Sequence, residues 1–211
     1  MKKIIMTFII IFITTSLSAQ VINITDRQKF KQFDWECNTS LSIGLSSKSS
    51  ESSSQYYYSN NSGNGEFYSE ISLALGFYIL DGLSIEPEIE YNFFEGDATL
   101  SLIGNVAYTL NLPGKKIYPF FKIGYGISGY SAYGYNYYER SSGLFESLNA
   151  KVINAGIGLK IVQSSLFAMR IELNYKNIRY AHSQEVLYDG SYDISTNTSA
   201  LSIKIGGSFI F

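Results

Sequence analysis

Apolar side chains alternate with small or polar ones along most of the chain after residue 33. A period of two places successive side chains on opposite faces of an extended strand, so the pattern predicts strands rather than helices. Eight such segments can be followed, and each has one apolar face. Their approximate bounds are 35–45, 67–79, 83–93, 98–112, 117–129, 153–161, 167–176 and 201–211.

The connections between these segments alternate in length. Asp81-Gly82 is a two-residue hairpin signal, and Pro113-Gly114 marks another turn. Gaps of about 20, 3, 19 and 13 residues interleave with gaps of about 2, 4 and 4. An up-and-down outer-membrane barrel has long loops outside the cell and short turns in the periplasm. The pattern therefore favours such a barrel over the alternative, a secreted β-sandwich.

Composition and charge restrict the classes of partner. Charged residues make up 16% of the 211 residues, below the roughly 25% of an average soluble domain. The net charge of −2 gives no field that would attract nucleic acid. Cys37 is the single cysteine, which excludes an intrachain disulfide and a cysteine-cluster metal site. Since no metal, nucleotide or flavin motif occurs, no cofactor is expected.

The first 32 residues predict export. Lys2 and Lys3 precede a nearly continuous apolar run over 4–13, and small residues follow up to Ala19. The run is shorter than a membrane-spanning helix, so residues 1–19 are interpreted as a secretory signal peptide cleaved after Ala19. Removing both lysines leaves 14 basic and 18 acidic residues, a net charge of 14 − 18 = −4. Residues 20–32 are predicted to form a short periplasmic leader, and 33–211 the barrel domain.

Several segments resemble a known family. They are Tyr118-Pro-Phe-Phe-Lys-Ile-Gly-Tyr-Gly126, Asn154-Ala-Gly-Ile-Gly-Leu-Lys160, Arg170-Ile-Glu-Leu-Asn-Tyr175 and the terminal Phe-Ile-Phe211. In these the chain resembles the small outer-membrane barrels of the OmpA/OmpX type, and the outer-membrane β-barrel domain proteins of the Bacteroidetes, which are Gram-negative. The resemblance covers about 33–211 and implies an all-β, eight-stranded, antiparallel up-and-down transmembrane barrel surrounded by outer-membrane lipid. It also implies that Phe211 is the signal read by the outer-membrane assembly machinery during insertion.

The inward face of this barrel is predicted to hold charges of both signs. An eight-stranded barrel is just wide enough for side chains to fill it, and near-balanced buried charges favour paired networks. By parity the inward acids and bases are Glu36, Glu70, Glu86, Glu88, Glu90 and Glu172 with Lys122, Lys160, Arg170, Lys176 and Lys204. The prediction is a lumen closed by salt bridges.

Two contacts within the lumen follow from strand depth. Glu172 and Lys204 are expected to face each other, and Glu88 and Glu90 to meet Lys122 across the lumen. The alternative is a narrow pore for small solutes or ions, lined by the acidic row over 86–90.

Aromatic residues have two predicted locations. Near the periplasmic strand ends, Trp35, Tyr78, Tyr118 and Phe167 are expected to form an interfacial girdle. In the outer loops, tyrosine with Ser, Gly and Asn suits adaptable recognition of an extracellular ligand, although the same residues also suit strand extensions and solvated loops. The candidate recognition residues are Tyr56, Tyr57, Tyr58, Tyr133, Tyr135, Tyr137 and Tyr138.

Catalysis would need a base oriented toward a nucleophile. His182 is the only histidine, and Ser183 beside it points to the opposite side of an extended chain. Ser195 or Ser199 on the next strand could reach it, but nothing singles either out. The expected function is therefore non-enzymatic, a structural or surface-interaction role through the outer loops. A narrow pore is the second hypothesis, and a lipid-acting hydrolase is the third.

Overall fold

The structure, a computed structural model, describes residues 30–53, 58–94, 97–112, 114–131, 150–186 and 190–211. The predicted signal peptide and residues 20–29 of the predicted leader lie outside this part of the chain. Within it, no helix has the length and hydropathy of a membrane span. The described residues form eight strands: β1 (Trp35–Ser53), β2 (Tyr58–Leu80), β3 (Leu83–Phe94), β4 (Asp97–Thr109), β5 (Ile117–Ser131), β6 (Ala150–Val162), β7 (Phe167–Val186) and β8 (Gly190–Ile210).

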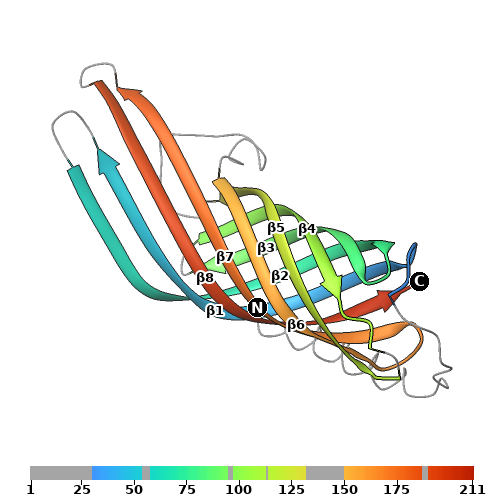
Figure 1. Cartoon of the computed structure of the whole chain (residues 1–211). Coiled ribbons are helices and arrows are strands. Elements are labelled where there is room, and N and C mark those ends of the chain that lie inside the picture. The colour runs from blue at the N-terminus through green and yellow to red at the C-terminus, as the bar shows by residue number, and fades with distance from the viewer. Residues whose placement is uncertain (1–29, 54–57, 95–96, 113, 132–149, 187–189) are drawn as a thin grey trace.

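The eight strands close into one antiparallel barrel in chain order (Figure 1). Each strand pairs with the next, and β8 returns to β1 through a register that begins at Glu36 opposite Ile210. The predicted all-β antiparallel barrel is therefore confirmed. The hairpin signal at Asp81-Gly82 is also confirmed, because β2 ends and β3 begins on either side of it. Gly82 has a φ of 81° there, which is the region that favours glycine.

Side chains alternate between the two faces of the barrel wall. Along β6, nearly every second residue is buried while those between are exposed or intermediate. The exposed residues are mostly large and apolar. Ile157 on β6 is 61% exposed, and Leu201 and Ile203 on β8 are each 53% exposed. The inward members are small or charged. The wall thus has an apolar outside and a polar inside, the inverse of a water-soluble protein and the arrangement of a transmembrane barrel.

Four strands are much longer than the other four. Strands β1, β2, β7 and β8 contain 19, 23, 20 and 21 residues, whereas β3 to β6 contain 12, 13, 15 and 13. Because β8 pairs with both β1 and β7, the extra lengths form one four-stranded sheet in the order β2-β1-β8-β7, which extends beyond the rest of the barrel (Figure 1). We call these extensions, residues 47–53, 58–66, 180–186 and 190–199, the projecting sheet.

The projecting sheet corrects one prediction. The gap of about 20 residues after the first predicted strand, 47–66, is not one long loop, since only 54–57 separate β1 from β2. The described residues on either side are strand extensions, the alternative that their sequence left open. The stretch between the last two predicted strands is likewise mostly strand. These segments lack an apolar face, which is why a hydrophobic period did not reveal them, but backbone hydrogen bonding to neighbours continues without it.

Candidate functional site

A cluster of buried, mostly apolar side chains, which we call the plug, lies at one end of the lumen. This end holds both described termini, so we call it the terminal end. The plug consists of buried side chains from the first described residue and five positions near the strand ends: Phe30, Tyr78, Tyr118, Val162, Ala168 and Ile210. Phe30 is fully buried, with ring centroids 5.6 Å from Tyr78 and 5.2 Å from Tyr118.

Backbone and side-chain hydrogen bonds hold Phe30 in place. Its carbonyl oxygen accepts hydrogen bonds from the Gly82 backbone N–H at 2.8 Å and from Asn111 Nδ2 at 3.3 Å. Phe30 and Phe33 have φ values of 62° and 71°, a region that residues other than glycine adopt rarely. The chain therefore accepts strained backbone to turn Phe30 into the mouth of the barrel.

The plug also corrects the predicted aromatic girdle. Tyr78 is fully buried and Tyr118 is 7% exposed, so neither belongs to an outer girdle, whereas Trp35 is 52% exposed on the outside. Phe167 is 4% exposed, and its ring centroid lies 5.3 Å from that of Phe209, which is 42% exposed. The physical reason for the two tyrosines is parity. Tyr78 is an even-numbered residue on β2, where Glu70 and the other even positions face inward, and Tyr118 has the same relation to Lys122 on β5. The alternation contained this information, whereas nothing before the first strand predicted the burial of Phe30.

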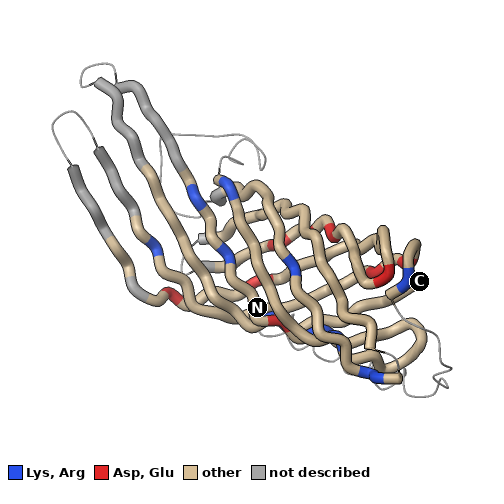
Figure 2. Tube along the Cα trace, viewed as in Figure 1, with Lys and Arg blue, Asp and Glu red and all other residues tan. Residues whose placement is uncertain are grey.

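The middle of the lumen is a continuous chain of ion pairs. All eleven charged residues predicted to face inward are buried there, and charged positions of both signs lie along the barrel strands (Figure 2). Acidic and basic side chains alternate along this ion-pair chain without a break. In order they are Glu36, Lys160, Glu86, Arg170, Glu172, Lys122, Glu88, Lys204, Glu90, Lys176 and Glu70.

The chain of ion pairs begins against the plug. Lys160 Nζ lies 2.6 Å from Glu36 Oε2, and the Tyr78 hydroxyl donates a hydrogen bond of 2.6 Å to the same carboxylate oxygen. The Lys160 ammonium also lies 4.9 Å from the centroid of the Phe30 ring. A cation over an aromatic face is attracted by the ring quadrupole, so the plug and the charges stabilise each other.

Arg170 connects the first half of the ion-pair chain to the second. Its Nη1 lies 3.0 Å from Glu86 Oε2, and its Nε lies 3.3 Å from Glu172 Oε2. Its guanidinium carbon is 4.2 Å from the centroid of the Phe120 ring. From Glu172 the pairing continues to Lys122 at 3.0 Å, and Lys122 lies 3.0 Å from Glu88.

Lys204 is the most connected cation in the ion-pair chain. Its Nζ lies 2.6 Å from Glu70, 2.9 Å from Glu88 and 3.1 Å from Glu90. Lys176 bridges Glu70 and Glu90 on the other side. Each buried charge therefore has at least one partner of opposite sign, the condition under which charges persist in a low-dielectric interior.

Glycines make room for these side chains. A Cβ at Gly156 would contact the carboxylate of Glu172, and one at Gly124 would contact the side-chain amide of Asn105. Asn105 Nδ2 donates to Glu88 Oε2 at 2.9 Å. The lumen is thus filled to the point where a methyl group would displace a member of the network.

The predicted lumen contacts are met in part. Glu88 pairs with Lys122 as expected. Glu172 lies opposite Lys204 in the strand register, but the two do not form an ion pair among the described contacts. Glu90 contacts Lys204 and Lys176 rather than Lys122. Register alone fixes which backbones are neighbours, whereas long side chains in a narrow lumen reach across to the opposite wall.

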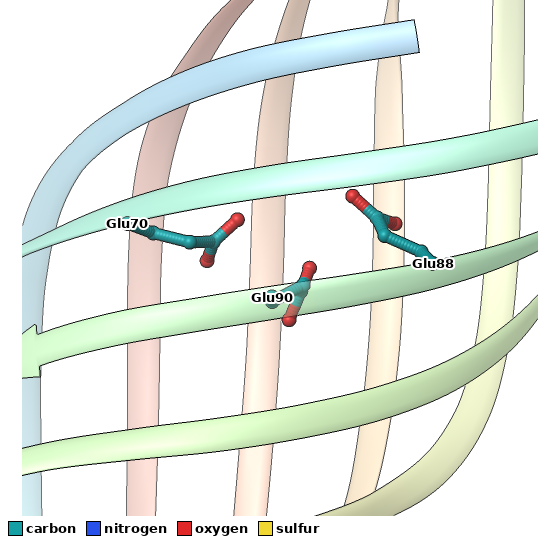
Figure 3. Close-up of side chains that lie close together, drawn as sticks. All are labelled: Glu70, Glu88 and Glu90. Carbon is teal, nitrogen blue, oxygen red and sulfur yellow. The ribbon is translucent and has the colours of Figure 1, made fainter. Parts of the chain in front are cut away.

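Three carboxylates in the lumen have a spacing that could suit a metal ion. Oxygen atoms of Glu70, Glu88 and Glu90 lie within 4.8 Å of one another, and the three side chains converge from β2 and β3 (Figure 3). Lys204 contacts all three, and Lys176 contacts two of them. The positive charge that a divalent cation would supply is therefore already present as ammonium groups.

Between the ion-pair chain and the projecting sheet, the lumen is lined by neutral polar groups. Asn92 Nδ2 donates to Ser101 Oγ at 3.3 Å, and Ser101 Oγ donates to Ser128 Oγ at 2.9 Å. The lumen therefore changes along its axis from aromatic to ionic to neutral polar.

The residues of the hydrolase hypothesis are placed by backbone pairing. The β7–β8 register puts His182 opposite Ile194, Ser195 opposite Ala181 and Ser199 opposite Asn177. Neither serine lies directly across from His182, and Ser195 belongs to the other face of the pleat.

The candidate recognition tyrosines fall mostly outside the described residues. Tyr56, Tyr57, Tyr133, Tyr135, Tyr137 and Tyr138 are not described, and Tyr58 is the first residue of β2. Phe211 lies at the terminal end, where its backbone exchanges two hydrogen bonds with Trp35. Its side chain is 68% exposed.

Comparison with known proteins identifies the fold. No family model and no curated protein matches the chain. The solved structure of the outer membrane protein OprG from Pseudomonas aeruginosa is similar over 88% of this chain and 99% of its own, with 10% identity and a TM-score of 0.57. The outer membrane enzyme PagL covers 77% of this chain and 97% of its own, with 15% identity and a TM-score of 0.45. The N-terminal β-barrel domain of Pseudomonas aeruginosa OprF is similar over 82% of this chain and 97% of its own, with 16% identity and a TM-score of 0.38.

The likeness to OprG shows a shared fold. At 10% identity the chain has the architecture of a small outer-membrane β-barrel, and the likeness extends no further than that architecture.

Proposed function

We propose that this chain is a non-enzymatic outer-membrane barrel that acts through the surface at its projecting end, with a lumen closed by its own side chains. The observation that carries the proposal is the contrast between the two ends. The terminal end is plugged and followed by an unbroken ion-pair chain, whereas the other end extends a hydrogen-bonded sheet away from the barrel.

The exterior supports a membrane location. Large apolar side chains around the barrel are about half exposed, Ile43, Ile89, Ile123 and Ile157 among them. An apolar band facing outward with polar residues facing inward is the pattern of lipid-embedded barrels, and closed barrels of this kind occur in outer membranes. Outer-membrane lipid is thus the first partner, and assembly machinery that reads Phe211 is the second.

The extent of the strands beyond the barrel body supports an orientation. At the terminal end, β2 and β3 are joined by two residues, β4 and β5 by seven and β6 and β7 by four, whereas at the other end β1, β2, β7 and β8 continue past the body into the projecting sheet. In outer-membrane barrels short turns face the periplasm. The projecting sheet then lies outside the cell, where a rigid barrel can present it for recognition.

Single-channel conductance of the refolded protein tests the closed lumen. Heat-modifiable gel mobility first establishes that the barrel has formed. A folded barrel is expected to give no discrete openings in a planar bilayer. Openings that change in a Glu88→Gln, Glu90→Gln variant would overturn the closed lumen and make this a narrow pore.

An ester-hydrolysis assay on outer-membrane lipid tests the non-enzymatic part. No turnover above the lipid-only control is expected. Turnover that disappears in His182→Ala, with heat-modifiable mobility retained, would replace the proposal with the hydrolase hypothesis.

A further inference from the structure

One edge of the projecting sheet has no described strand beside it. Strand β2 pairs with β1 up to Tyr58, which lies opposite Ser53. On its other side, β2 pairs with β3 only from Ser69, opposite Phe93, toward the terminal end. Within the described part of the chain, residues 58–66 therefore have a neighbouring strand on one side only. Figure 1 shows β2 continuing past the end of β3.

The chain next to this edge is too short to cover it. Strand β3 ends at Phe94 and β4 begins at Asp97, with two residues between them. The opposite edge of the sheet, residues 180–186 of β7, also pairs on one side only among the described residues, because its pairing with β6 ends at Arg179 while its pairing with β8 continues. That edge adjoins the start of β6, which follows residues 132–149, outside the described part of the chain. The edge over 58–66 is the better defined of the two, because the neighbouring chain is described up to Phe94 and only two residues separate β3 from β4.

The sequence of this edge lacks two of the usual protections, proline and lysine. Natural sheets block exposed edges with proline, lysine, bulges or short strands. Residues 58–66 read Tyr-Ser-Asn-Asn-Ser-Gly-Asn-Gly-Glu and contain no proline or lysine. One irregularity is present, a register shift between Ser46 and Lys48 of β1, opposite Gly65 with its φ of 55°. From Gly63 to Tyr58 the pairing with β1 is regular, so a straight row of backbone groups remains.

We propose that residues 58–66 of β2 bind an extended segment of another protein, which adds a strand to the projecting sheet. This inference rests on the proposed function and names the kind of partner it would engage. The segment would run antiparallel to β2, in the position that β3 would occupy if it continued past Phe94. Backbone hydrogen bonds supply the affinity in this mode of recognition, and alternate side chains supply the specificity.

The size and direction of the edge favour a peptide segment over a second copy of this chain. The regularly paired residues 58–63 extend about 20 Å, and one strand pair is small beside the roughly 1,200–2,000 Å² of a stable protein–protein interface. Two copies in one membrane point the same way, so their β2 edges would meet in parallel. Every strand pair in the barrel is antiparallel, and parallel pairing is slightly less stable.

Random linear dodecapeptides displayed on phage can test this edge. They would be selected on the refolded full-length barrel. Three variants then separate the possible binding sites. An edge-covering variant carries a Thr/Val-rich hairpin between Glu95 and Gly96 that lengthens β3 along residues 58–66. Its matched control carries a Gly/Ser insert of equal length, and a trimmed variant replaces residues 49–62 with Asn-Gly.

The expected result is at least tenfold weaker peptide binding to the edge-covering variant, with less than a twofold change for the Gly/Ser control. In the unmodified protein, bound peptide should slow amide hydrogen exchange in residues 58–66 at least tenfold, which is a readout that does not depend on any variant folding. Equal binding to the edge-covering variant, or unchanged exchange in residues 58–66, would overturn the proposal.

The remaining outcomes distinguish this inference from the proposed function. Peptides that bind the edge-covering variant but not the trimmed one would overturn the assignment of the binding site to this edge. They would leave the projecting sheet as a recognition surface, in agreement with the proposed function. If no peptide is enriched, the proposal that this edge binds a peptide segment is overturned. A conductance trace without openings would still support the proposed closed lumen. Dimers of the pure protein that the edge-covering hairpin abolishes would assign the edge to a second copy instead.

Discussion

The barrel body and the projecting sheet are built from the same strands but are specified differently. Along β8, residues 200–206 alternate strictly between buried and exposed side chains, whereas residues 195–199 are all exposed or intermediate. In the body each residue has a defined side, apolar toward the exterior or polar toward the lumen. At residues 195–199 the backbone pairing continues without that alternation, and side chains add hydrogen bonds such as the one that Ser49 Oγ donates to the Asn197 carbonyl oxygen at 3.4 Å. The comparison teaches that this part of the projecting sheet is specified by backbone pairing and not by a buried face.

The largest effect should follow from removing the central cation of the lumen. Lys204→Met leaves three carboxylates within 4.8 Å of one another with one fewer counter-charge. Breaking a buried ion pair by deleting one partner costs about 3–5 kcal/mol, so the free energy of unfolding, measured by urea titration in lipid vesicles, should fall by that amount. Lys115→Met, at an exposed position in the connection between β4 and β5, is the control.

Equal stability of Lys204→Met and Lys115→Met would contradict the ion-pair chain. A companion variant sharpens the test, because the ion-pair chain in the lumen contains six acids and five bases. Glu90→Gln keeps the shape of the side chain and balances the count, so it should cost less than Lys204→Met.

A somewhat smaller effect is expected when a charge is placed on the outside of the body. Ile203 is 53% exposed on the exterior, and arginine at the middle of a bilayer costs a barrel about 2–4 kcal/mol. Ile203→Arg should therefore lower the free energy of unfolding in vesicles by this amount. Ser195→Arg, on the same strand within the projecting sheet, should change it by about 0.5 kcal/mol or less. Similar losses for both would mean that lipid does not surround the body at residue 203.

A single methyl group tests how tightly the lumen is filled. A Cβ at Gly156 would contact the Glu172 carboxylate, and overpacking costs about 1–3 kcal/mol. Gly156→Ala should lower the free energy of unfolding in this range. Gly104→Ala is the matched control on a neighbouring part of the wall, because its nearest contact would be 3.9 Å away. A neutral Gly156→Ala would show that the network has spare room.

The smallest effect should come from shortening the projecting sheet. Replacing residues 49–62 with Asn-Gly joins Lys48 to Gly63, which already lie opposite each other, through a turn suited to hairpins. Because the sequence of this region has no alternation of apolar and polar residues, the free energy of unfolding should change by about 1 kcal/mol or less. The change in heat-modifiable mobility on boiling should also persist. Failure of the shortened chain to close would mean that the projecting sheet is needed to form the body.

The sequence predicted most of the body because lipid imposes a simple rule on it. One face must be apolar and the narrow interior must pair its charges, so alternation located all eleven lumen charges and the eight strands. The partners within the lumen were less predictable. Glu90 reaches Lys176 and Lys204 instead of Lys122, since the final pairing depends on side-chain length and on glycine gaps opposite. The plug residue Phe30 precedes the first strand, where no periodicity exists.

The ends of the strands were hidden for the same physical reason. Outside the apolar band neither face needs hydrophobic residues, so Ser, Asn, Thr and Gly continue a strand without signalling it. The candidate tyrosines illustrate the ambiguity, since Tyr58 belongs to β2. Recognition by such a region depends on backbone geometry, which composition does not encode.

The pairing of β1 with β8 has a consequence for how the molecule folds. It joins Glu36 to Ile210, residues that are nearly the whole described length of the chain apart, and such distant contacts form slowly because the entropy of loop closure opposes them. Until that seam forms, the first and last strands expose unpaired backbone groups that hydrocarbon cannot satisfy. Insertion and closure are therefore expected to occur as one cooperative event, with β8, a strand of 21 residues, as the piece that completes it.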